Sequence, residues 1–265
     1  MIFPRKWIEW RPGLLIPVFF LACCQVTGQG LCPYAETSAL GLCYATRSGV
    51  ASSGLNQAGL GRTDKNRVAL HHARPFITPD LDIVSLSAQL SLNRGGPGFI
   101  LSTMGIKGMR QTSAWISYGL MLHPRLFAGA GIHLQNTRIA EDAIHHFSAG
   151  FALGLQFMVN DELLLGAHVK KGEGLMITSG LSYFFYKTAW YHTEFHMASG
   201  KQVQWSNGLE IIITDSLLLL LGVNNQPWSL SAGISMKYRN WGLSLAWSYC
   251  MDTGSTPRTS LSYEW

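Results

Sequence analysis

The chain has 265 residues, of which 47% are hydrophobic and only 13% charged, and its formal net charge at pH 7 is +5. Beyond the first thirty residues the apolar residues are dispersed rather than gathered in long runs, which argues against a helical membrane protein and favours a membrane β-barrel. No basic stripe interleaved with aromatic residues occurs, so nucleic acid is not an expected partner.

The first thirty residues have the features of a secretory leader. A basic head precedes the apolar run GLLIPVFFLACC, and small or polar residues follow it. This pattern predicts a signal peptide over residues 1–28, cleaved ahead of Gln29. Two alternatives use the same residues. One is a lipoprotein with residues 21–23 as a weak lipobox, and the other is an uncleaved anchor, which Pro17 disfavours by interrupting a short run.

Cleavage would leave three cysteines, Cys32, Cys43 and Cys250. Export places a chain where disulfides form, and Cys32–Cys43 is the local candidate. The alternative leaves the thiols free, with Cys250 a small residue on the polar face of a strand.

Residues 29–64 are small and glycine-rich and do not alternate, and the stretch Glu36–Ala45 favours a short helix. From residue 65 to residue 265 the apolar residues instead recur with a period of two, which indicates strands with unlike faces. In FSAGFALGLQFMV, every second residue from Phe147 to Val159 is apolar, while the opposite face is small and mildly polar. We therefore expect an N-terminal segment at 29–64 and a β-barrel at 65–265.

The same alternation recurs in DIVSLSAQLSLN, RLFAGAGIHLQ, PWSLSAGISMKYR and WGLSLAWSYCMD. Several runs are about ten residues or longer, which is the length that a tilted strand needs to cross a bilayer. A soluble β-sandwich also alternates, but its strands tend to be shorter and its outer faces more charged. The prediction is an all-β fold, a transmembrane antiparallel β-barrel of about 14 strands (12–14), with the lipid bilayer as its first partner.

The expected strands lie at roughly 66–76, 81–92, 96–105, 110–123, 125–137, 145–159, 162–170, 174–187, 189–198, 202–214, 217–224, 227–239, 241–251 and 257–265. The last of them ends in TSLSYEW, with apolar residues at 261, 263 and 265 on one face. A barrel has no free edge, so this strand is expected to pair with the first. An aromatic last residue is also similar to the C-terminal signal that the barrel-assembly machinery reads, which makes that machinery an expected partner.

One motif ahead of the barrel resembles a known family. Asn56, Gln57, Ala58, Gly59 and Leu60 are similar to the Asn-Pro-Ala-Gly-Leu motif of FadL-type outer-membrane transporters, especially their PorV/PorQ-like relatives in Bacteroidetes, with Gln57 in place of the proline. The resemblance implies that residues 29–64 pack inside a fourteen-stranded barrel as a plug or hatch. It also implies that Asn56, Ala58, Gly59 and Leu60 belong to the plug and its ligand site.

In this family apolar ligands can leave sideways through a kinked strand. The resemblance makes the stretch Gly95–Gly98 the candidate for such a kink, because glycine and proline both weaken a ladder. The alternative for the same residues is a plain hairpin turn.

Three polar residues of WYHTEFHMAS share one strand face: His192, Glu194 and His196. Histidine and carboxylate are legitimate zinc ligands, but same-face neighbours along a strand stand about 7 Å apart. We therefore favour a polar cluster in the lumen, add these three residues to the candidate ligand set, and predict no metal and no cofactor.

No catalytic fingerprint occurs. The chain has no Gly-x-Ser-x-Gly elbow and no Rossmann or P-loop motif between a strand and a helix. A barrel esterase would need a serine activated by a histidine, but serines are so frequent on the inward faces that such a meeting carries little weight. We predict a protein that is not an enzyme and has no catalytic residue.

The predicted function is passive transport of a hydrophobic solute, such as a fatty acid, across the cell outer membrane. The small, weakly polar lumen face favours this over an ion-selective porin. The alternative is a PorV/PorQ-like scaffold or shuttle component with secretion-system proteins as partners at the cell surface. Short loops, the longest at about residues 137–145, weigh against an extensive shuttle surface.

Overall fold

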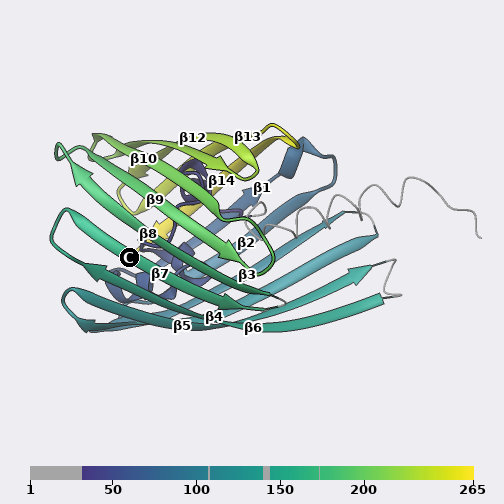
Figure 1. Cartoon of the computed structure of the whole chain (residues 1–265), viewed down its shortest axis with the longest axis horizontal. Helices are drawn as coiled ribbons and strands as arrows, with labels where there is room; N and C mark the ends of the chain where they lie inside the picture. Colours follow the sequence, from purple (N-terminus) through teal and green to yellow (C-terminus); the bar gives the residue numbers. More distant parts are fainter. Residues whose placement is uncertain (1–31, 107, 140–143, 173) are drawn as a thin grey trace, which may run out of the picture. The chain divides into compact units, whose positions relative to one another are not determined.

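A computed structural model describes residues 32–106, 108–139, 144–172 and 174–265. Within them, fourteen antiparallel strands form a closed barrel in which each strand pairs with its neighbours in sequence and β14 pairs with β1 (Figure 1). The predicted barrel of about fourteen strands is therefore confirmed. The predicted signal peptide, residues 1–28, lies outside the described residues. In the described part of the chain, no helix combines the length and the apolarity needed to cross a membrane.

The strands are β1 (Arg67–Ala73), β2 (Asp82–Gln89), β3 (Gly95–Ile106), β4 (Met109–His123), β5 (Leu126–Ile139), β6 (Ile144–Met158), β7 (Leu163–Lys171), β8 (Leu175–Phe185), β9 (Ala189–Ala198), β10 (Gln204–Thr214), β11 (Leu217–Asn225), β12 (Trp228–Tyr238), β13 (Trp241–Cys250) and β14 (Gly254–Glu264). The described helices are short: α2 (Ala35–Ala39), η2 (Val50–Ser53), η3 (Gln57–Arg62) and η4 (Pro75–Ile77).

The outer face of the barrel is apolar, as the alternation predicts. Ile116, Ile132 and Leu153 point outward from neighbouring strands and are 63%, 60% and 54% exposed. Side chains of this size are normally buried in a water-soluble domain, because exposing them costs roughly 1.5–3 kcal/mol each. A continuous band of them around a closed barrel is the outer surface that a lipid environment requires.

The strand β11 departs from the alternation because apolar residues lie on both of its faces. Leu220 points inward and is buried with Ala35, Ala39 and Leu40, so the run LLLLLGV packs against α2 on one side and faces outward on the other. A strand whose two faces are both apolar reads as a continuous hydrophobic run.

The C-terminal strand closes the barrel. Its register on β1 runs from Arg67 opposite Glu264 to Ala73 opposite Arg258. Just beyond that ladder, the backbone N–H of Asn66 donates to the carbonyl of Trp265, and the N–H of Trp265 donates back, both at 3.2 Å. The prediction that TSLSYEW is the closing strand is correct.

The stretch Gly95–Gly98 forms the second arm of a tight hairpin. The N–H of Leu92 donates to the carbonyl of Gly95 at 2.7 Å, and Gly95 adopts a φ of +143°, a conformation that favours glycine. The ladder continues from Gly95 through β3 onto β4 without a register shift. The alternative interpretation, a hairpin turn, is therefore the one that fits, and the ladder shows no kink there.

We call the end of the barrel that holds Asn66 and Trp265 the terminus end, and the opposite end the loop end. Connections are short at both. The longest at the loop end joins β1 to β2 through residues 74–81, which include η4. The prediction that the longest loop lies at residues 137–145 is wrong. Strand β5 continues to Ile139 and strand β6 begins at Ile144, so most of that stretch belongs to the two strands.

Candidate functional site

Residues 32–66, the luminal segment, lie inside the barrel ahead of β1, where Figure 1 shows them in purple. The helix α2 packs against β11, β12, β13 and β14, and η3 packs against β3, β4, β5 and β6. The backbone N–H of Ala35 donates to Ser260 Oγ on β14, at 3.1 Å. The segment therefore follows the inner wall around most of its circumference.

Glycines on the wall make room for this close path. A methyl group added to Gly208 would lie 2.7 Å from the carbonyl oxygen of Leu40, and one added to Gly119 would lie 2.5 Å from that of Gln57. Backbones approach this closely only where a side chain is missing. Six wall glycines meet the backbone of the luminal segment in this way: Gly119, Gly129, Gly154, Gly166, Gly208 and Gly222. Gly98 and Gly233 instead make room for side chains of the segment, those of Ser53 and Ala39.

The motif singled out in the sequence is at the centre of this contact. Asn56 caps η3 by accepting a hydrogen bond from the N–H of Ala58 at 3.2 Å, and its Nδ2 donates to the carbonyls of Ala45 (2.5 Å) and Ala167 (3.3 Å). Asn56 and Ala58 are completely buried, as are Gly59 and Leu60 beside them. These residues hold the fold of the luminal segment; a part in ligand binding stays a prediction.

The second predicted group, on β9, also contacts the luminal segment. Glu194 Oε1 accepts a hydrogen bond from the N–H of Ala45 at 2.5 Å. The imidazole of His196 lies beside it, with Nε2 3.7 Å from Glu194 Oε2. His192 is hydrogen-bonded through Nδ1 to Ser182 Oγ at 2.5 Å.

The three side chains share one buried face of β9, as the spacing predicts, but they do not converge on one point. The described residues contain no group of three His, Cys, Asp or Glu side chains placed to hold a metal ion. Cys32, Cys43 and Cys250 are all free thiols, so the structure contains no Cys32–Cys43 disulfide.

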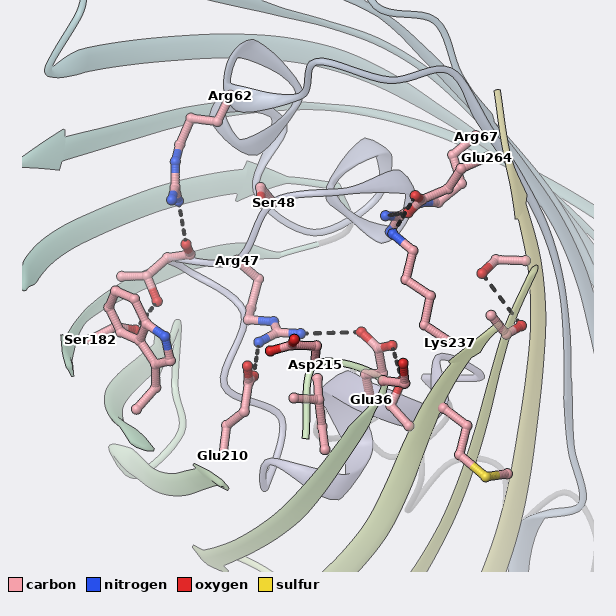
Figure 2. Close-up of a pocket in the computed structure, with 18 of the residues that line it drawn as sticks. Glu36, Arg47, Ser48, Arg62, Arg67, Ser182, Glu210, Asp215, Lys237 and Glu264 are labelled. Atoms are coloured by element: carbon pink, nitrogen blue, oxygen red, sulfur yellow. Dashed lines mark hydrogen bonds and ion pairs between the residues drawn. The ribbon is translucent and has the colours of Figure 1, made fainter. Parts of the chain in front are cut away.

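A cavity of about 340 Å³ lies between the luminal segment and the wall at the terminus end (Figure 2). Sequence reasoning missed this feature. Its charged lining residues are Glu36, Arg47, Arg62, Arg67, Glu210, Asp215, Lys237 and Glu264. The available signal was the placement of single charges at inward positions of otherwise apolar strands, as for Glu210 in LEIII.

Two ion-pair groups organise these charges. Arg47 of the luminal segment pairs with Glu36, at 3.1 Å, and with Glu210 of β10. Across the cavity, Glu264 is shared by three cations: Lys237 at 2.7 Å, Lys65 at 3.7 Å, and Arg67. Figure 2 shows the two groups on opposite sides of the cavity.

The pKa of Glu36 reflects this environment. Burial by itself would raise the pKa of the carboxyl group, but the charge of Arg47 and hydrogen bonds from Ser235 and Ser244 outweigh burial and hold the pKa below its ordinary value of 4.5. The pKa of Arg47 is raised: burial opposes its charge, and the two carboxylates more than compensate. Glu36 and Arg47 are therefore a charged pair at neutral pH.

Arg62 lines the same cavity, but unlike Arg47 it is hydrogen-bonded to neutral oxygens. Its Nη1 donates to the carbonyl of Thr46 at 2.9 Å and to Gln156 Oε1 at 3.2 Å, and its guanidinium lies 5.9 Å from the ring centre of Phe127. Among the described residues no carboxylate is paired with it. Burial, and then the nearby charge of Arg47, lower its pKa to about 10, so it remains cationic at neutral pH.

Comparison with known proteins identifies the fold. No family model matches the chain, and no curated protein matches it. The toluene transporter TodX of Pseudomonas putida superposes with a TM-score of 0.71 at 14% identity, over 87% of this chain and 97% of that one. The toluene transporter TbuX of Ralstonia pickettii gives 0.69 at 12% identity, over 89% and 98%. The monoaromatic hydrocarbon channel CymD gives 0.64 at 12% identity, over 87% and 96%.

These similarities extend over nearly the whole described chain. The FadL-type barrel that the motif at Asn56–Leu60 suggested is confirmed as a fold. The narrower PorV/PorQ-like relationship stays a prediction. The neighbours are transporters and channels by description, and the expectation that this chain is not an enzyme stays a prediction.

Proposed function

We propose that the protein is an outer-membrane β-barrel that passes a hydrophobic solute, with the luminal segment as its plug. The observation that carries the proposal is a closed barrel with an apolar outer band around an internally folded N-terminal segment. The same fold is found in transporters of toluene and a channel for monoaromatic hydrocarbons. Solutes of that class are therefore the first to test.

The cavity supports a narrower version of the proposal, a hydrophobic solute that carries a carboxylate, such as a fatty acid. Arg62 supplies a partly buried positive charge whose hydrogen bonds go to neutral oxygens rather than to a carboxylate. Trp190 and Leu164 line the same cavity and offer apolar surface. A carboxylate entering there would complete a charge-assisted pair, which is roughly twice as strong as a neutral hydrogen bond.

The test begins with mass spectrometry of compounds that co-purify with the full-length protein in mild detergent. Cells that express the protein are then assayed for uptake of labelled oleate and labelled toluene. We expect both to enter faster than in cells without it. Arg62→Gln should slow oleate several-fold and leave toluene unchanged, while Arg125→Gln, at an exposed turn of the terminus end, should change neither. A folded barrel that accelerates neither compound would contradict the proposal.

The predicted location and assembly partner belong to the same proposal. Trp265 is 54% exposed beside Tyr263, with ring centres 6.1 Å apart, and so is accessible to an assembly machinery at the terminus end. For the alternative, a secretion scaffold, the described loop end offers only short connections. No observation favours that alternative over transport.

A further inference from the structure

Three polar side chains form a row on the outside of the barrel at its loop end: Arg110 of β4, Arg138 of β5 and His145 of β6. These strands are neighbours in the wall (Figure 1). Arg138 is paired directly with Arg110 on one side and with His145 on the other. All three side chains are exposed, and the register puts them on the outward face, which on β5 also carries Ile132. We call these three residues the rim row.

The rim row marks the edge of the apolar outer band. On the outer face of β6 the next residue toward the middle of the strand is Phe147, which is 66% exposed. On β5 the residues in the same direction are Asn136 and then Leu134. Two residues advance about 7 Å along a strand, and less along the axis of a tilted barrel. The rim row therefore lies just outside the hydrocarbon, at the depth of the lipid headgroups.

Two like charges stand side by side in this row. The Cβ atoms of directly opposed residues on neighbouring strands are about 4.5–5.5 Å apart, and like charges so placed destabilise a sheet. Among the described residues Arg110 forms one hydrogen bond, from its Nε to the neutral Thr103 Oγ1 at 3.4 Å. An anion that accepts hydrogen bonds from both guanidinium groups would replace this repulsion by charge-assisted pairs.

The described carboxylate in the same ladder is already engaged elsewhere. Asp82 of β2 is paired with Gly105 of β3, and Gly105 with Arg110. Asp82 accepts hydrogen bonds from Arg74, at 2.9 and 3.1 Å, and from His72 Nε2, at 3.0 Å. Asp82 is thus occupied by its own partners and lies two strands away from Arg110.

From this arrangement we infer that the rim row binds the phosphate groups of a phosphorylated glycolipid in the outer leaflet of the membrane. The planar fork of a guanidinium matches two phosphate oxygens, and a pair of arginines can hold one phosphate from two sides. The imidazole of His145 adds a donor at the end of the row. The acyl chains of the same lipid would pack against the apolar band beside Phe147. A lipid fits this position better than an acidic protein, because the row is continuous with the apolar band.

The inference rests on the proposed outer-membrane location. The terminus end presents the closing strand to the assembly machinery and so faces the periplasm, which leaves the loop end at the cell surface. It goes beyond the proposed function, because it concerns the lipid around the barrel and not the solute that passes through it.

The first experiment measures lipid binding to the full-length protein by native mass spectrometry in detergent. The probes are lipid A and its dephosphorylated form. We expect the wild-type protein to retain lipid A about tenfold or more over the dephosphorylated form. Equal retention of the two lipids would overturn the inference, and this comparison needs no variant.

A pair of double variants locates the binding. Arg110→Gln with Arg138→Gln should lower retention of lipid A about tenfold. Arg94→Gln with Arg125→Gln is the matched control, because it removes two exposed charges from turns of the terminus end, and it should retain lipid A as the wild type does. An equal loss in both double variants would contradict a site at the rim row.

The second experiment identifies the partner in intact cells. A photo-crosslinking amino acid replaces Asn136, beside the row, or Leu126, at the opposite end of β5. We expect an adduct with the phosphorylated glycolipid from position 136 and none from position 126. No lipid adduct, or equal adducts from the two positions, would overturn the inference, and an adduct with a protein from position 136 would replace the lipid by a protein partner.

Two controls separate this inference from the proposed function. Membrane fractionation of the same cells records where the protein is, so a wrong location is distinguished from a wrong partner. Uptake of oleate and toluene should be unchanged in Arg110→Gln with Arg138→Gln, because the rim row lies outside the barrel. A failure to bind lipid A therefore leaves the transport proposal to its own test.

Discussion

Glu194 on β9 accepts a hydrogen bond at 2.5 Å from the backbone N–H of Ala45, a residue 149 positions earlier in the chain. Both groups are completely buried. We expect Glu194→Ala to leave that N–H without a partner and to lower the free energy of unfolding by about 1–3 kcal/mol. Glu194→Gln, which keeps an acceptor oxygen, should lose less. The check is the temperature at which the folded band disappears in unboiled electrophoresis; equal losses in the two variants would contradict it.

The close contact between the wall glycines and the luminal segment gives a second prediction. Gly208→Ala would place a methyl group 2.7 Å from the Leu40 carbonyl, so the luminal segment or the wall must shift. We expect a loss of about 1–3 kcal/mol in barrel stability, as for an overpacked core. Gly174→Ala is the matched control, because an added methyl group there meets nothing within 4 Å. Proteolysis of the luminal segment should accelerate only in Gly208→Ala, and the same rate in both variants would refute the prediction.

The apolar outer band of the barrel gives a third prediction. Ile132 lies near the middle of β5 on the outer face and is 60% exposed. Ile132→Arg should cost about 2–4 kcal/mol if that position is at the bilayer midplane. Tyr186→Arg, at an exposed turn of the terminus end, should cost little. Refolding yield into lipid vesicles measures both, and a normal yield for Ile132→Arg would argue against a membrane location of this band.

The depressed pKa of Glu36 predicts how docking of α2 depends on pH. A carboxyl group with a lowered pKa in the folded state stabilises that state above its ordinary pKa, here 4.5, and the contribution is lost as the pH falls through the lower folded value. We therefore expect exchange protection of α2 to be constant from pH 7 to about pH 5 and to fall below about 4.5. In Glu36→Gln this part of the pH dependence should disappear. A loss of protection that begins near pH 6 would point to another group.

Much of the barrel could be predicted from the sequence, because a strand with one face in lipid and one in the lumen leaves a period of two in the residues. The run from Phe147 to Val159 and the terminal TSLSYEW carry that period clearly, and both are strands. The expected edges moved by a few residues, as from 174–187 to Leu175–Phe185, because turns and strand ends share the same small polar residues.

The inside of the barrel was harder to predict. A period of two shows that Glu210 points inward, but not that Arg47, far away in the chain, pairs with it. The inward glycines suggested a small, weakly polar lumen; in the structure six of them lie directly against the backbone of the luminal segment. Such pairings depend on the register and closure of the whole barrel, which no local pattern encodes.

The position of the luminal segment also limits how the protein can assemble. Residues 32–66 are made before any of the strands, yet they are enclosed by all the strands made after them, and the seam between β1 and β14 begins directly where the segment ends. Once that seam is hydrogen-bonded, the side of the cylinder offers no opening for the segment to enter. Residues 32–66 therefore have two routes to their place: they lie against the growing sheet before its last strand pairs with its first, or they fold in through the terminus end, where the segment joins β1.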